Sequence, residues 1–241
     1  MNFIRDTMKI TVENTNCDYT NTYLINELAT SYINFTFEFE KIVSRQSKKS
    51  IQKNFITKIK AELKKYNWII ISDIQLEIYW YLNATERQET DKIGDLDNIT
   101  KPLIDSFIGF DGIIVDDSQI TSINTLWMSR NDLIEDNIVK IKFTFNNDYS
   151  LKKENLIFAL YSPPMCTPVN VNLIEKDKLK HIIKLLEYKS SLSAFAKTFK
   201  KNGANIDRYL LVSEWNFHRT RLSGFPNSMI YTLDKLKELA G

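Results

Sequence analysis

Two short stretches of this sequence hold most of the side chains that could do chemistry. The stretch DLDNITKPLID, residues 95–105, contains three aspartates and a lysine, and GIIVDDSQI contains an adjacent acidic pair shortly afterwards. The charged residues are Asp95, Asp97, Lys101, Asp105, Asp116 and Asp117. They are either solvated charges at the start of a helix or the acidic cluster of a metal-dependent enzyme.

The first stretch predicts a helix over 98–107. If Asp97 caps it, Asp97, Lys101 and Asp105 follow at four-residue intervals on one face, and Asp95 in an extended lead-in points to the same side. An ordinary helix cap with i, i+4 ion pairs, each worth roughly a few tenths of a kcal/mol, would use the same residues. Because Pro102 lacks the N–H that bonds four residues back, a helix that begins about one or two residues later also stays open.

Asp116 and Asp117 favour the metal-site interpretation. Crowded carboxylates disfavour each other's ionised forms unless a cation neutralises them. Hard cations such as Mg2+ prefer oxygen ligands, and two metals about 4 Å apart can activate water and stabilise the leaving oxygen of a phosphodiester. Lys101 would then favour the negative charge of the transition state or position the nucleophile. Four carboxylates and a lysine therefore suit phosphodiester hydrolysis.

Other acidic motifs fit less well. An EF-hand loop that starts at Asp95 needs glycine sixth and glutamate twelfth, where the chain has Thr100 and Ser106. A haloacid dehalogenase-type phosphatase would place its Asp-x-Asp after a buried apolar strand, and ETDKIG is not one. A glycosyltransferase Asp-x-Asp stays open, although nothing resembling a nucleotide-sugar domain precedes it.

The elements that must position these residues form a mixed α+β domain. Apolar residues at helical spacing predict an amphipathic helix over 51–63. Apolar alternation predicts strands over 34–40, 73–82, 119–128 and 138–146. Gly109 and Gly112 supply permissive backbone for the turn before Asp116. This order of elements indicates one domain over 31–148.

The rest of the chain divides by composition. A linker is predicted over 149–170, because Pro163, Pro164 and Pro168 discourage regular structure. Residues 1–30, before the mixed domain, are expected to form an N-terminal extension. Helical periodicity predicts a small, mainly α-helical module over 171–241. Its helices are expected around 179–186, LSAFAKTFKKNG, NIDRYLLVSEW and SMIYTLDKLKELA.

The two parts differ in charge. Residues 1–148 hold 17 Lys and Arg against 22 Asp and Glu, net −5, whereas 149–241 hold 15 against 8, net +7. An acidic part that could hold cations, joined to a basic part that could hold polyanions, suits a nucleic-acid enzyme, although two unlike surfaces would give the same balance.

The segment DLDNITKPLIDSFIGFDGIIVDDSQI, residues 95–120, resembles the signature of the RusA family of Holliday junction resolvases. The pattern is Asp-x-Asp-Asn, then Lys, Asp and Asp-Asp-x-Gln, and VSRQSKK upstream is similar to a Ser-x-Gln stretch of larger members. The resemblance implies a RusA-like mixed sheet with helices on one side. It also implies a homodimeric crossover junction endodeoxyribonuclease that acts on branched DNA with Mg2+, for which Mn2+ would substitute.

The same resemblance assigns roles to residues. The metal ligands and catalytic carboxylates would be Asp95, Asp97, Asp116 and Asp117, with Lys101 as the catalytic lysine and Asn98, Asp105 and Gln119 as site supports. Some relatives carry arginines just before the first aspartate, which this chain lacks. Since DNA is held mainly through phosphates, other basic or polar residues must bind it. The candidates are Arg45, Gln46, Lys48, Lys49, Arg219 and Arg221, although basic runs are also typical of solvated helix faces.

Composition restricts the remaining possibilities. With 43% hydrophobic and 26% charged residues, and no apolar run near the roughly 20 residues of a membrane span, we expect a cytoplasmic globular protein. Cys17 and Cys166 are too far apart to suggest a disulfide framework or a zinc site. The alternatives are a catalytically weak DNA- or partner-binding protein on the same fold and a Mg2+ enzyme acting on small phosphates.

Overall fold

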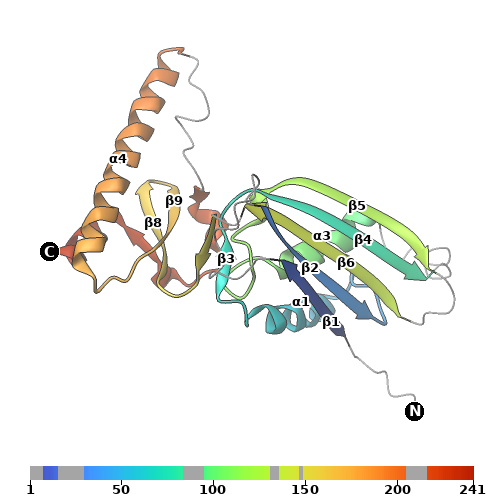
Figure 1. The fold of residues 1–241 in the computed structure, drawn as a ribbon. Helices are drawn as coiled ribbons and strands as arrows, with labels where there is room; N and C mark the ends of the chain where they lie inside the picture. Colours follow the sequence, from blue (N-terminus) through green and yellow to red (C-terminus); the bar gives the residue numbers. More distant parts are fainter. Residues whose placement is uncertain (1–7, 16–29, 84–94, 131–135, 147–148, 205–215) are drawn as a thin grey trace. The chain divides into compact units, whose positions relative to one another are not determined.

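A computed structural model describes residues 8–15, 30–83, 95–130, 136–146, 149–204 and 216–241 (Figure 1). The chain forms two compact units. The first contains residues 1–66 and 73–150, and the second contains residues 67–72 and 151–241.

The first unit is built on a mixed sheet with the strand order β1-β2-β6-β4-β5. Its strands are β1 (Lys9–Thr15), β2 (Thr30–Phe39), β4 (Ile74–Asn83), β5 (Ile120–Arg130) and β6 (Asn137–Asn146). All neighbours are antiparallel except β4 and β5, which are parallel. A parallel pair needs a crossover, and helix α3 (Leu96–Ser106) lies between these two strands in the chain. The predicted strands are present, and β1 forms within the expected N-terminal extension.

Helices α1 (Lys49–Leu63) and α3 cover one face of this sheet. Alternate residues of β2, β4 and β6 are buried beneath them, among them Phe35 and Phe143. Phe107, which follows α3, packs against Phe143 with ring centroids 4.7 Å apart, and Phe55 of α1 packs against Phe39 at 6.4 Å. The expected α+β fold with helices on one side is thus confirmed.

A tight turn leads from α3 to the second acidic stretch. The carbonyl of Phe107 accepts the N–H groups of Ile113 at 2.9 Å and Ile114 at 3.2 Å. A Cβ atom on Gly112 would lie 1.9 Å from that same oxygen, so only glycine fits there. Gly109 has a φ of 95°, a conformation that glycine adopts at little cost. The chain then continues through Asp116 into the 3-10 turn η2 (Asp117–Gln119).

The second unit contains helices and a second sheet. The sheet has the order β10-β9-β8-β11, and its strands are β8 (Leu156–Ser162), β9 (Met165–Asn170), β10 (Phe217–His218) and β11 (Ile230–Thr232). Helices α4 (Lys176–Lys201) and α6 (Leu233–Ala240) pack on it. Strand β3 (Trp68–Ile70) pairs with β7 (Ser150–Lys152), and η4 (Arg219–Leu222) and η5 (Asn227–Met229) are short 3-10 turns.

The structure differs from the expected linker over 149–170, which contains β7, β8 and β9. Pro163 and Pro164 form the turn of the β8–β9 hairpin, and Pro168 lies in β9 opposite Phe158. The prolines therefore mark a hairpin instead of a break between domains. Helix α4 is one continuous helix where two were expected. Helix α6 covers only the second part of SMIYTLDKLKELA, whose first part forms the end of η5 and strand β11. The expected helix NIDRYLLVSEW (205–215) lies outside the described residues. Among the helices that the structure describes, none has the length and apolar character needed to cross a membrane.

Candidate active site

Helix α3 sorts its residues into two rows at four-residue spacing. Ile99, Leu103 and the following Phe107 are fully buried against the sheet. Asp97, Lys101 and Asp105 form the other row, and none of them is buried. Because residues four apart share a helix face, packing of the apolar row fixes the direction of the charged row.

The helix begins earlier than the sequence predicted. It starts at Leu96, so its N-cap is Asp95, in an extended conformation, and Asp97 lies in the first turn. The Asp95 side chain makes no capping hydrogen bond, whereas its carbonyl accepts the Asn98 N–H at 2.9 Å. The Asp95 carboxylate is therefore not used to satisfy the helix end.

Pro102 lies inside α3 and does not delay its start. A residue at this position would normally donate its N–H to the carbonyl of Asn98, and proline has none. That carbonyl instead accepts the backbone N–H of Arg45 at 2.9 Å. The loop between β2 and α1 is thereby fastened to the helix that carries the charged row.

Lys101 joins the two acidic stretches. Its Nζ donates to Asp105 Oδ1 at 2.6 Å and to Asp117 Oδ2 at 2.8 Å. Partial burial disfavours the ammonium, but the hydrogen bonds and charges of the two carboxylates outweigh it and raise the pKa of Lys101 above its ordinary value. Lys101 is therefore a cation held at a defined position.

Gln119 and Asp116 stabilise the turn between the acidic pair and β5. Gln119 Oε1 accepts the N–H groups of Val115 at 2.7 Å and Asp116 at 3.0 Å, and Asp116 Oδ1 accepts the Ser118 N–H at 3.1 Å. Asp116 and Gln119 are both buried. The acidic pair is thus divided, since Asp117 reaches Lys101 while Asp116 bonds to its own turn.

The family of this part of the chain follows from a match to a family model. Residues 31–144 match the model described as Endodeoxyribonuclease RusA. This segment belongs to the RusA family. The matched segment, residues 31–144, is called the RusA domain below, and it contains all the candidate catalytic residues. Nearly all of the second unit lies outside this match. A search of the curated proteins found none that matches the chain.

The RusA domain has an open cavity of about 630 Å³ at the start of α3. Its lining residues are Arg45, Asp95, Leu96, Asp97, Thr100, Lys101, Ile104, Ile123 and Thr125. Five of them were not predicted from the sequence, because Leu96, Thr100 and Ile104 look like ordinary helix residues and Ile123 and Thr125 like ordinary strand residues. Their only sequence signal is that each lies close to an acidic stretch. Asp116 and Asp117 do not line the cavity.

The carboxylates of the RusA domain suit a hard divalent cation by their oxygen donors. Asp95 and Asp97 line the same cavity, and Asp117 is joined to it through Lys101. Within the described residues, however, no three acidic, histidine or cysteine side chains are grouped closely enough to hold a metal ion. The carboxylate oxygens are thus suitable ligands for Mg2+, but the described residues do not bring three of these side chains together around one position.

The candidate DNA-binding residues divide between the two units. Four of them are exposed in the RusA domain: Arg45, Gln46 and Lys48 lie in the loop between β2 and α1, and Lys49 is the first residue of α1. Gln52 fixes that loop, because its Nε2 donates to the carbonyls of Arg45 and Ser47, at 2.9 and 2.7 Å. Arg219 and Arg221 are exposed in η4 of the second unit and are therefore not part of the RusA domain.

Proposed function

We propose that the protein is a Mg2+-dependent endonuclease that cuts four-way junctions or related branched DNA. The observation that carries this proposal is the position of Lys101, which lines the same cavity as Asp95 and Asp97 and bonds to Asp117, in a RusA-family domain. A protonated lysine among carboxylates suits a substrate that is an anion and gains negative charge as it reacts.

Each residue would have a distinct role. Asp95, Asp97, Asp116 and Asp117 would hold the cation, which when bound supplies Lewis acidity and an activated water. Lys101 would bind the scissile phosphate, with its ammonium kept in place by Asp105. The Arg45 guanidinium, carried on a loop that is bonded to α3, would position a neighbouring phosphate. Asn98 and Gln119 would orient the site through the bonds that fix this loop and the acidic turn.

The proposal includes a homodimer, and strand β5 is the surface that would support it. In the described part of the sheet, β5 is an edge strand, with β4 on its one paired side. Ile123 and Leu126 on this strand are 48% and 46% exposed. A long edge strand with exposed apolar residues is a ready surface for pairing with another strand. Since Ile123 also lines the cavity, pairing of two copies here would bring their cavities near each other.

The test is cleavage of end-labelled four-way junction, flap and linear duplex DNA, with Mg2+ or with EDTA. The parent protein should cut the branched substrates only with Mg2+, and Asp97→Asn should lose that activity while folding normally. Asp111→Asn is the matched control, because Asp111 is a partly exposed aspartate of the same domain that pairs with Lys64 instead of Lys101.

Three results would count against the proposal. Failure of the folded parent protein to cut any DNA would sink it. Junction binding that survives Asp97→Asn, without cleavage by the parent, would indicate a DNA-binding protein. Phosphate release from nucleotides without DNA cleavage would indicate an enzyme of small phosphates.

A further inference from the structure

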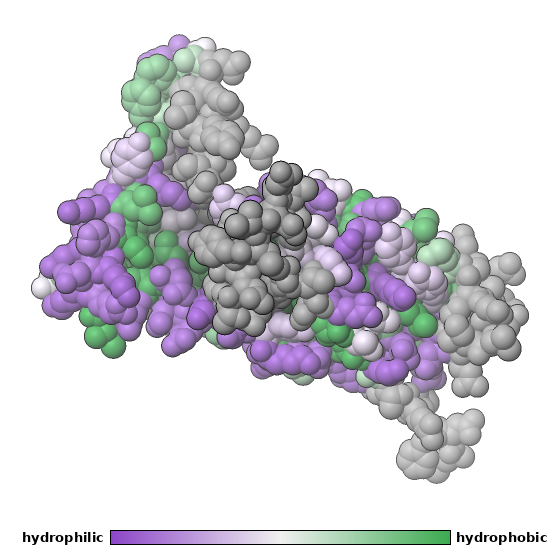
Figure 2. All heavy atoms as spheres, in the orientation of Figure 1, coloured by the Kyte–Doolittle hydropathy of each residue, from purple (hydrophilic) through white to green (hydrophobic). Residues whose placement is uncertain are grey.

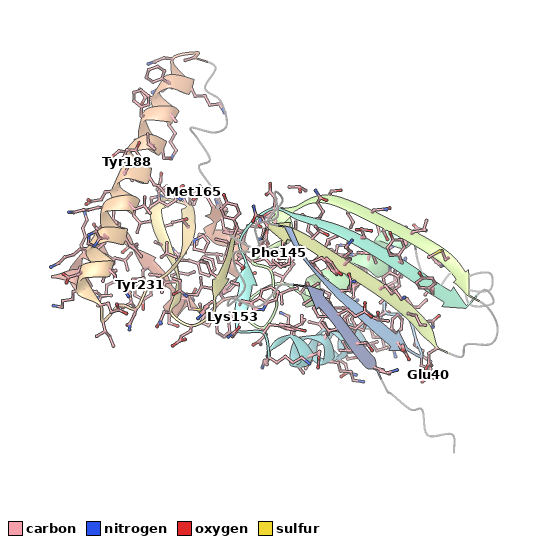
Figure 3. The ribbon with its side chains drawn as sticks, in the orientation of Figure 1. Glu40, Phe145, Lys153, Met165, Tyr188 and Tyr231 are labelled. Atoms are coloured by element: carbon pink, nitrogen blue, oxygen red, sulfur yellow. The ribbon has the colours of Figure 1, made fainter. Side chains whose placement is uncertain are left out.

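Helix α4 carries an apolar row on the side opposite its core. The core side buries Leu179, Ile183 and Leu186 against the sheet of the second unit. The outer stripe consists of Leu185, Tyr188, Leu192, Phe195 and Phe199. Four of these five side chains are 42–63% exposed, and Leu192 is half-buried. Figure 3 shows Tyr188 projecting from α4.

The spacing of the outer stripe is that of a helix-pairing surface. Its members follow at intervals of three, four, three and four residues, the heptad repeat by which two helices pack together. At about 1.5 Å per residue the stripe is roughly 21 Å long. The rings of Phe195 and Phe199 already contact each other, with centroids 4.4 Å apart.

The C-terminal half of α4 extends past β8 and β9 within its own unit, as Figure 1 shows, and Figure 2 shows hydrophobic side chains gathered over that end. Contiguous exposed apolar surface usually marks an interaction site. This side of the helix is therefore a candidate binding surface.

Charge decides which occupant fits. Helix α4 contains eight lysines against Asp177 and Glu187, and from residue 188 to its end at 201 it has four lysines and no carboxylate. Glu187 is paired with Lys237 of α6. A second copy of α4 would oppose one basic helix to another, which like charge disfavours. A nucleic acid would satisfy the lysines, but Leu185 and Leu192 have no ring to stack on a base and its binding needs no heptad spacing.

We propose that the outer stripe docks an acidic amphipathic helix of a partner protein. Apolar residues of that helix at the same three-four spacing would pack on the stripe, and its carboxylates would face the α4 lysines. The surface lies in the second unit, so the proposal does not depend on the nuclease function of the RusA domain.

The test uses the full-length protein and a fluorescent peptide of about 21 residues, three heptads with leucine at positions a and d and glutamate at e and g. Anisotropy should rise on titration with the parent protein, and a scrambled peptide of equal composition should not bind. The double variant Phe195→Ser/Phe199→Ser should weaken binding by at least about tenfold. Ala194→Ser, at an exposed position of the same helix outside the stripe, should bind like the parent. Added salt should weaken binding.

Circular dichroism and branched-DNA cleavage of the double variant should match the parent, which separates loss of docking from loss of folding or of nuclease function. The proposal is overturned if the peptide binds no better than its scrambled form. Loss of oligothymidylate binding but not of peptide binding in the double variant would also overturn the proposal. So would a self-association of the parent, measured by sedimentation, that the double variant abolishes.

Discussion

The backbone N–H of Arg45 donates to the carbonyl of Asn98 at 2.9 Å, across the junction between the β2–α1 loop and helix α3. Pro102 makes this bond available, since in a regular helix the residue at 102 would bond that carbonyl. The adjacent residues Lys101 and Pro102 therefore have two separate effects. Lys101 carries the charge, and Pro102 frees the acceptor that holds Arg45 beside it.

Replacement of Pro102 by alanine should loosen this junction. The new N–H would compete for the Asn98 carbonyl, and removal of proline from a helix interior can stabilise the helix by up to about 3 kcal/mol. We therefore expect an unchanged or higher urea midpoint together with faster amide hydrogen exchange at Arg45. Ser191→Ala, inside α4, should not change exchange at Arg45. Undiminished protection of the Arg45 amide in Pro102→Ala would contradict this interpretation of the proline.

Lys101→Ala should remove activity without removing the fold. Loss of a positioned cation near developing negative charge typically costs about 10²–10³ in rate. The side chain of Lys101 is 38% exposed, so its ion pairs should contribute no more than about 1 kcal/mol to stability. Single-turnover cleavage of a four-way junction and thermal melting would measure the two effects. Lys64→Ala, which removes a surface ion pair with Asp111, should leave both nearly unchanged. A fall in melting temperature that accounts for the lost activity would argue for a structural role.

Much of the candidate site could be predicted from the sequence because it depends on local spacing. The row Asp97, Lys101, Asp105 follows from four-residue periodicity, and Lys101 does contact Asp105. The helix start could not be predicted. A proline at 102 is expected to destabilise a helix that begins before residue 98, because it leaves the Asn98 carbonyl without its usual N–H donor. Arg45, which supplies the donor instead, lies more than fifty residues earlier in the chain.

The second unit was predicted less fully for the same reason. Its helices have their own periodicity, but its sheet depends on pairing between distant segments. Ile230 of β11, for example, pairs in parallel with Phe158 of β8. The prolines of the β8–β9 hairpin gave a local signal of irregularity, and only the long-range pairing shows that they occupy a turn and a strand.

Cys166 should behave as an inert core residue. It is fully buried, and burial raises the pKa of its thiol to about 11, an effect that the nearby Arg219 charge opposes only in part. In a Cys17→Ser background, Cys166 should resist thiol reagents at pH 8 in native protein and react in urea, where its thiolate is accessible. Rapid labelling of the native protein would contradict its burial.

The same shift sets a pH dependence of stability. A pKa raised on folding stabilises the native state fully below the unfolded value of 9.0, and this contribution is lost as the pH rises through about 11. The free energy of unfolding should therefore fall over that interval. Cys166→Ala should show a smaller fall, and equal slopes for the two proteins would exclude Cys166 as the cause.

Gly112→Ala should damage the RusA domain more than a comparable glycine substitution elsewhere. The new Cβ would overlap the Phe107 carbonyl oxygen, which cannot move away without breaking its bonds to the N–H groups of Ile113 and Ile114. We expect a loss of about 2–4 kcal/mol in the free energy of unfolding, together with lost cleavage, because this turn leads directly to Asp116.

Gly203→Ala is the control. Gly203 has a φ of +79° but no atom within 4 Å of the added carbon, so this substitution should lower the free energy of unfolding by only about 1–2 kcal/mol. Urea unfolding of both variants measures the difference, and equal losses would show that the close approach at Gly112 has no special cost.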